Sequence, residues 1–172
     1  PLTLFTITKE TDIAIIEMGA NHRGEISLLC DIAKPNHGII TNIGKAHLEG
    51  FGGYQGVIKA KTELYNFIRE THGKLFVNAE DKLLMEKSDG MNCIYYGNDS
   101  WTPVAGKIVG KFPFLSAEII IHNELVTVNT KMVGSYNLAN MLAAACIGNH
   151  FGVPAEQTGQ ALAAYEPKNN RS

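Results

Sequence analysis

Three side chains with the chemistry of a metal and phosphate site occur within the first 61 residues. Glu17 ends one apolar run, His47 follows a second one in the glycine-rich stretch TNIGKAHLEGFGG (41–53), and Lys61 comes soon after. A carboxylate and an imidazole can serve a divalent cation, directly or through water, when the cation also bridges to phosphate oxygens. The alternative is that Glu17 caps the next helix and that His47 is a solvated loop residue.

Lys61 lies on the apolar side of a helix predicted over 54–70. That side is formed by Val57, Ile58, Leu64, Tyr65 and Ile68. The opposite side, which is expected to face solvent, is formed by Lys59, Thr62, Glu63, Asn66 and Arg69. Burial disfavours an ammonium, so the pKa of Lys61 is expected to fall, and a neutral amine reacts with carbonyl groups or carbon dioxide. The alternative is a lysine whose stem packs while its head reaches water.

Two side-chain amides lie one turn apart where a helix is predicted to begin. They are Asn137 and Asn140, in the stretch GSYNLANMLAAA (134–145). Side-chain amides at this place could read the edge of a nucleotide base, or they could cap the helix. The chain contains no GxxxxGK[ST] phosphate loop. At Gly106-Lys107, the residue five positions before Gly106 is Trp101 and not the required glycine.

The elements that must position these side chains alternate between strand and helix. IAIIEMG (13–19) predicts a buried parallel strand, 24–33 a helix that stops at Lys34-Pro35, and HGIITNIG (37–44) a second strand. Two more strands are predicted over 74–81 and 92–99, around a short helix near 81–88. Ligands of such sheets lie beyond the carboxyl ends of the strands, so Glu17 and His47 are expected at one edge.

The second half of the chain changes pattern. The residues 104–133 predict antiparallel strands with a turn at His122-Asn123. A long helix is predicted over 137–150, and a last helix over 154–165 follows the break at Gly152-Val153-Pro154. The fold class predicted from these elements is α/β: a mostly parallel sheet flanked by helices, with a small antiparallel segment.

Composition bounds the class of protein. The chain has 172 residues, 45% of them hydrophobic and 19% charged, with a formal net charge of −2, which is typical of a soluble globular protein and gives no reason to expect nucleic acid or membrane as partner. The cysteines Cys30, Cys93 and Cys146 are odd in number and far apart, which favours reduced core thiols and a cytoplasmic protein. The absence of an initiator Met and the linker-like ending PKNNRS indicate a piece of a larger protein.

Four motifs together resemble one family over nearly the whole chain. They are EMGANHRGEI (17–26), TNIGKAHLEGFGG (41–53), VIKAKTELY (57–65) and VGSYNLANMLAAA (133–145). They are similar to motifs in the central ATPase domain of the Mur ligases. The similarity is to those members of the family that add D-alanyl-D-alanine to UDP-N-acetylmuramoyl-tripeptide. The resemblance implies a bacterial cytoplasmic ligase of peptidoglycan synthesis, monomeric, that uses ATP and Mg²⁺ to form an amide through an acyl phosphate.

The resemblance also implies roles for single residues. Glu17 and His47 match the residues of the family that bind magnesium. Lys61 matches the lysine that family members carry as a carbamate, which supports the second metal ion. Asn137 and Asn140 match the residues that contact the adenine.

Two further matches and two departures complete the comparison with the family. Arg171 matches an arginine that reaches ATP, and Asn42 matches a recurrent asparagine beside the site. Arg23 stands where proline is common, and Lys45 stands where a small or acidic residue is usual. Lys45 adds positive charge two residues from His47.

The family pattern further implies that the phosphate loop, the substrate domain before it and the C-terminal domain are outside residues 1–172. The piece alone is therefore expected to be inactive. The alternatives are another Mur or folylpolyglutamate-type ligase, and a non-catalytic nucleotide-binding module of the same fold.

Overall fold

The computed structural model describes residues 2–44 and 48–167. The chain forms two compact units. The helical unit comprises Pro1–Gly38 and Ile43–Lys74, and the sheet unit comprises Ile39–Asn42 and Leu75–Ser172.

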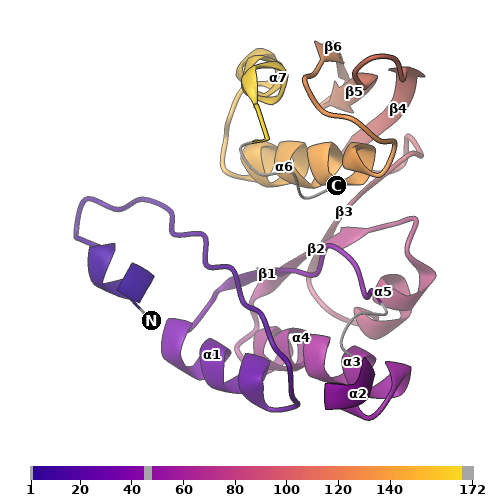
Figure 1. Cartoon of the computed structure of the whole chain (residues 1–172). Helices are drawn as coiled ribbons and strands as arrows, with labels where there is room; N and C mark the ends of the chain where they lie inside the picture. The colour runs from indigo at the N-terminus through magenta and orange to yellow at the C-terminus, as the bar shows by residue number, and fades with distance from the viewer. Residues whose placement is uncertain (1, 45–47, 168–172) are drawn as a thin grey trace. The chain divides into compact units, whose positions relative to one another are not determined.

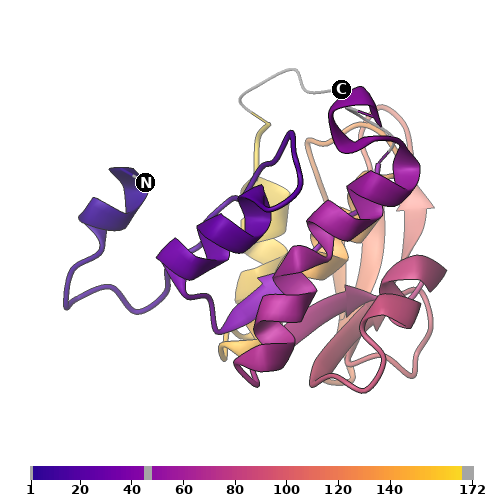
Figure 2. The same cartoon turned by 90° about the horizontal axis from the view of Figure 1, so that it is seen from below.

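The helical unit is a cluster of short helices. Among the described residues it contains η1 (Leu2–Thr6), α1 (Glu25–Ala33), α2 (Leu48–Phe51), α3 (Tyr54–Lys61) and α4 (Glu63–Glu70). The helix α1 packs on α3 and α4, and α2 packs on α3, as Figure 2 shows. The predicted helix over 24–33 is confirmed, and it ends where Lys34 adopts a left-handed φ of 48° before Pro35.

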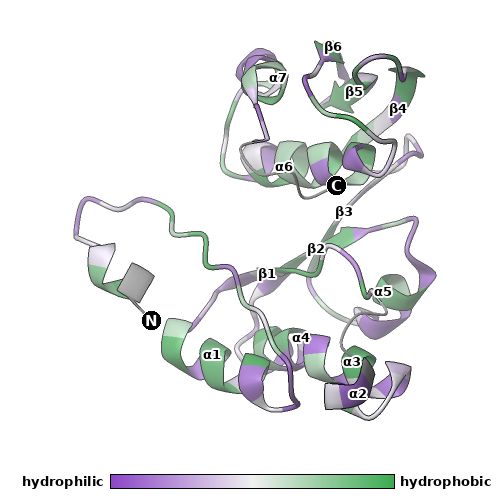
Figure 3. Cartoon of the chain, in the orientation of Figure 1, coloured by the Kyte–Doolittle hydropathy of each residue, from purple (hydrophilic) through white to green (hydrophobic). Residues whose placement is uncertain are grey.

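The predicted buried strand over 13–19 is wrong. The stretch has no regular secondary structure, and Ile13 and Ile15 are 50% and 82% exposed. Figure 3 shows this run as a hydrophobic trace that leads toward α1. A strand needs a neighbour for its N–H and C=O groups, and the sheet formed by the described residues does not include this segment. An apolar run indicates a preference for burial, but it does not supply the pairing partner.

The predicted single helix over 54–70 is wrong at one point, because it is interrupted at Thr62. The Thr62 hydroxyl donates hydrogen bonds to the carbonyl oxygens of Ile58 (2.8 Å) and Lys59 (3.2 Å). A threonine hydroxyl that bonds back to the preceding turn bends a helix. The helix α3 therefore ends at Lys61, and α4 begins at Glu63.

The strands pair in one sheet in the order β1-β2-β3-β4-β5-β6 (Figure 1). Their bounds are β1 His37–Ile39, β2 Lys74–Asn78, β3 Cys93–Gly97, β4 Val104–Gly110, β5 Ser116–Ile121 and β6 Glu124–Asn129. The strand β3 pairs in parallel with both β2 and β4, whereas β4, β5 and β6 pair antiparallel. The second predicted strand, over 37–44, ends early, at Ile39. The predicted turn is confirmed, since His122 and Asn123 both have positive φ (49° and 67°), as a two-residue hairpin turn requires.

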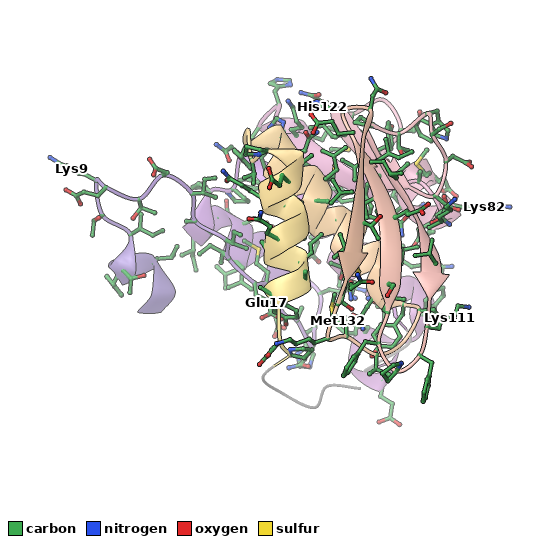
Figure 4. All side chains as sticks on the ribbon, turned by 90° about the horizontal axis from the view of Figure 1, so that it is seen from above. Lys9, Glu17, Lys82, Lys111, His122 and Met132 are labelled. Carbon is green, nitrogen blue, oxygen red and sulfur yellow. The ribbon has the colours of Figure 1, made fainter. Side chains whose placement is uncertain are left out.

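Helices cover the sheet within the sheet unit. The short helix α5 (Lys82–Lys87) follows β2, α6 (Asn137–His150) packs on β3, β4 and β5, and α7 (Ala155–Ala164) packs on β6. Figure 4 shows α7 against the strands, with His122 at one end of the β5–β6 hairpin and Met132 and Lys111 at the other. Phe76, Leu115, Ile119, Met141 and Leu142 are among the fully buried side chains of the core.

The α/β class, the parallel part of the sheet and the antiparallel segment are thus confirmed. All three cysteines are free, Cys30 and Cys146 are buried, and Cys93 is half-buried. Burial raises the pKa of the Cys146 thiol to about 12, which makes it inert. No helix among the described residues is long and apolar enough to cross a membrane.

Candidate functional site

Glu17 lies in the irregular segment before α1, with its side chain exposed. It lines a cavity of ≈ 420 Å³ whose other walls are apolar and formed by Leu4, Ile15, Ile16, Leu29, Ile32 and Ala33. The residue at the N-cap of α1 is Gly24, and the first turn receives its carboxylate from Glu63 and not from Glu17. The alternative in which Glu17 caps the next helix is therefore wrong.

Two carboxylates hold the loop that follows Glu17. Glu25 Oε2 accepts the backbone N–H groups of Asn21 (2.7 Å) and His22 (3.2 Å). These hydrogen bonds lower the pKa of Glu25 below its ordinary value, the bond from Asn21 being the largest cause. Glu63 accepts the N–H groups of Gly24 (2.7 Å) and Ser27 (3.0 Å). The prediction that Glu63 lies on a solvated face is wrong, since it is half-buried and bonded to α1.

The stretch that carries His47 is described only in part. His47 and Lys45 lie outside the described residues, so the place of His47 stays a prediction. The helix α2 begins at the next position, Leu48. A Cβ atom added to Gly50 would lie 2.7 Å from the Asn21 carbonyl oxygen, so glycine is what lets α2 approach the loop after Glu17. The segment after His47 is thereby packed against the segment after Glu17.

Lys61 is the last residue of α3 and is half-buried. Burial lowers the pKa of Lys61 below its ordinary value, as the sequence predicted. The lowered pKa enlarges the neutral fraction of the amine, which is the form that takes up carbon dioxide. The environment of Lys61 thus suits a carbamate, and its metal-binding role stays a prediction.

The Glu17 carboxylate and a carbamate on Lys61 are oxygen donors, the kind of ligand that magnesium prefers. No group of three or more His, Cys, Asp or Glu side chains that could hold a metal ion exists among the described residues. Magnesium does not require such a cage, because it keeps several waters and is commonly bound by one or two carboxylates together with phosphates. Glu17, His47 and a carbamate on Lys61 would be the protein's share of such a site.

The two asparagines lie in the sheet unit, at the start of α6. The Asn137 amide donates to the Val133 carbonyl oxygen (2.8 Å), and the Asn140 amide donates to Asn137 Oδ1 (3.2 Å). The N-cap residue is Tyr136, without a side-chain cap, so the alternative in which the asparagines cap the helix is wrong. The structure does bring Asn137 and Asn140 together, and Asn140 remains exposed. Their contact with adenine stays a prediction.

The other two predicted site residues are Asn42 and Arg171. Asn42 is an exposed residue of the sheet unit. Arg171 lies outside the described residues. The residue that the sequence reasoning missed is Glu63, whose partners Gly24 and Ser27 are 39 and 36 positions away. No local pattern signals a contact over that separation.

The fold described above and the four sequence motifs together indicate a single protein family. The model of the Mur ligase middle domain matches residues 1–148, and the chain therefore belongs to the Mur ligase family. It is similar to the UDP-N-acetylmuramoyl-tripeptide--D-alanyl-D-alanine ligases of Escherichia coli (strain K12), at 30% identity over 174 residues, and of Bacillus subtilis (strain 168), at 28% over 162 residues. These alignments cover 95% and 94% of this chain but 37% and 35% of the relatives, so the chain spans about a third of their length.

Solved structures of similar fold belong to the same family as these relatives. A crystal structure of MurF from Acinetobacter baumannii has a TM-score of 0.84 and 27% identity, covering 98% of this chain and 37% of that one. The structure of MurF ligase from Thermotoga maritima in complex with ADP has a TM-score of 0.73 and 25% identity, covering 88% of this chain and 35% of that one. The resemblance to Mur ligases predicted from the four motifs is thus confirmed.

Proposed function

We propose that the full-length product of this gene is an ATP-dependent ligase that adds D-alanyl-D-alanine to UDP-N-acetylmuramoyl-tripeptide during synthesis of peptidoglycan precursors. The observation that carries the proposal is the similarity to ligases of that name along nearly the whole chain. The half-buried Lys61, with its lowered pKa, adds a physical argument from the chain itself.

We further propose that residues 1–172 act as the central domain of this ligase. The phosphate loop, the N-terminal substrate domain and the C-terminal domain would be supplied by other parts of the gene product. The protein would act in the bacterial cytoplasm as a monomer, on nucleotide-linked substrates. Ligase turnover by residues 1–172 alone would contradict this division.

The reaction has two steps. The terminal carboxylate of the tripeptide attacks the γ-phosphorus of ATP, which forms an acyl phosphate and releases ADP. The amine of D-alanyl-D-alanine then attacks the acyl carbon, loses a proton, and the tetrahedral intermediate expels inorganic phosphate to leave the amide.

The residues of this chain bind and orient the reactants. Glu17, His47 and Lys61 as a carbamate would hold two magnesium ions, which would offset the negative charge of the phosphates. By resemblance to the family, Asn137 and Asn140 would contact the adenine and Arg171 would contact the ATP, whereas Asn42 matches a recurrent asparagine of the family. The burial that lowers the pKa of Lys61 keeps its amine available for carbamate formation.

The test is phosphate release by the full-length protein supplied with ATP, magnesium, UDP-N-acetylmuramoyl-tripeptide and one amine at a time. The proposal expects release that requires both the tripeptide and D-alanyl-D-alanine. Release with a single amino acid or with glutamate would keep the family and exclude this substrate pair. Nucleotide binding without release would favour a non-catalytic module.

A further inference from the structure

Glu63 opens α4 only two residues after Lys61, and its side chain reaches the start of α1. Each carboxylate oxygen accepts a different backbone N–H: Oε1 that of Gly24 at 2.7 Å, and Oε2 that of Ser27 at 3.0 Å. The first N–H groups of an α-helix have no partner within the helix, and they favour negative charge. The N-cap residue of α1 is a glycine, so the acceptor has to come from elsewhere in the chain.

The same loop is also where the segments after Glu17 and His47 meet. Asn21, four residues after Glu17, presents its carbonyl oxygen to the close approach at Gly50, three residues after His47. Gly24 of this loop is bonded to Glu63. Residues 21–24 therefore follow Glu17 directly and contact the segments that follow His47 and Lys61.

We propose that Glu63 is a positioning residue for the metal-binding end of the ligase. It fixes α4, and with it the end of α3 that carries Lys61, to the loop that follows Glu17. The inference rests on the proposed function for the roles of Glu17, His47 and Lys61. The carboxylate itself does not contact metal or substrate in this role, and its effect passes through the backbone of residues 21–24.

A matched pair of substitutions isolates this role. Glu63→Gln replaces one of two accepting oxygens by an NH₂ group that faces an N–H donor, so one bond to α1 is lost and a repulsion is added. Glu25 also accepts two backbone N–H groups beside α1, but both through Oε2 and both from its own loop. Glu25→Gln keeps an oxygen for these donors and leaves the link to α4 intact, so it is the control.

The first readout is binding of Mn²⁺ to the full-length protein without substrates, followed by electron paramagnetic resonance. Loss of a residue that orients metal ligands typically weakens binding by about 10- to 100-fold. We expect Glu63→Gln to raise the Kd for Mn²⁺ by about 10-fold or more, and Glu25→Gln to change it less than about threefold. Glu63→Asp keeps the charge but is one methylene shorter, so an intermediate Kd is expected and guards against a variant that fails to fold.

The second readout separates this inference from the proposed function. In the ligase assay, Glu63→Gln is expected to raise the magnesium concentration for half-maximal rate, with the rate recovered at saturating magnesium. Unchanged Mn²⁺ and Mg²⁺ dependence in a folded Glu63→Gln protein that remains an active ligase would overturn the positioning role alone. A wild-type protein that binds no metal and shows no ligase activity would overturn both.

Discussion

The helices α1 and α5 both follow loops, but their first turns are satisfied in different ways. Asp81, at the N-cap of α5, accepts the N–H groups of Leu83 (3.0 Å) and Leu84 (3.1 Å) through its own side chain. The helix α1 has a glycine at that position and takes its carboxylate from Glu63 in α4. A local cap stabilises one helix, whereas a remote cap also ties two helices together. The remote cap occurs in the unit that carries Glu17 and Lys61.

The two units also differ in which atoms make their closest packing contacts. In the sheet unit, α6 and the strands bury apolar side chains against one another. In the helical unit, backbone segments also approach closely at Gly50 and Gly56, where an added Cβ would lie 2.7 Å and 1.7 Å from a carbonyl oxygen. A side chain can rotate to relieve a contact, whereas a backbone carbonyl can shift only together with its chain segment.

The largest effect on stability is expected in the core of the sheet unit. Leu142 is 1% exposed and lies against Gly106 of β4, so Leu142→Ala should lower the free energy of unfolding by about 2–5 kcal/mol. Leu125, which is 62% exposed on β6, is the control, and Leu125→Ala should cost less than about 0.5 kcal/mol. Urea unfolding measures both. Equal costs would contradict the core assigned to this unit.

Two glycine substitutions compare the close approaches of the two units. An added Cβ at Gly56 in α3 would lie 1.7 Å from the Phe51 carbonyl oxygen, so Gly56→Ala should cost about 3 kcal/mol, at the upper end for overpacking. At Gly159 in α7 the nearest atom, at 2.4 Å, is Cγ1 of Val126, a side chain that can rotate. Gly159→Ala also gains about 1 kcal/mol of helix propensity, so its net cost should be within about 1 kcal/mol. Similar urea midpoints for both variants would remove the contrast.

The smallest effect concerns the local cap. Asp81→Ala removes the acceptor of two N–H groups and should lower the free energy of unfolding by about 1 kcal/mol. Because this cap ties no second helix, the Kd for Mn²⁺ should not change. A metal-binding defect in Asp81→Ala would mean that caps act on the site generally, and the distinction between local and remote caps would fail.

Much of the sheet unit could be predicted from the sequence because its signals are local. The bounds of α6 and the hairpin turn at His122-Asn123 follow from hydrophobic spacing and turn chemistry within a few residues. The structure of the helical unit was harder to predict, because it depends on contacts between residues that are far apart in the sequence. The apolar run 13–19 resembles a strand but lacks a pairing neighbour among the described residues, and the helix break at Thr62 arises from a hydroxyl that the hydrophobic pattern ignores.

The candidate site shows the same limit. The position of Lys61 on an apolar helix face predicts that its side chain is partly buried and that its pKa is lowered. The structure confirms both predictions. The role of Glu63 does not follow from any face, because its position on the helix is that of a solvent-exposed residue. Only the fold brings it to the N–H groups of Gly24 and Ser27.

The proposed ligase activity depends most directly on Lys61. The most direct test compares Lys61→Ala with Lys59→Ala in the full-length protein, by phosphate release with ATP, magnesium, UDP-N-acetylmuramoyl-tripeptide and D-alanyl-D-alanine. Lys59 lies in the same helix but is exposed, so it controls for the loss of a lysine. Lys61→Ala is expected to lower kcat/KM by about 10²- to 10³-fold while Lys59→Ala stays close to wild type. A Lys61→Ala protein within tenfold of wild type, or an equal loss in both variants, would contradict the account.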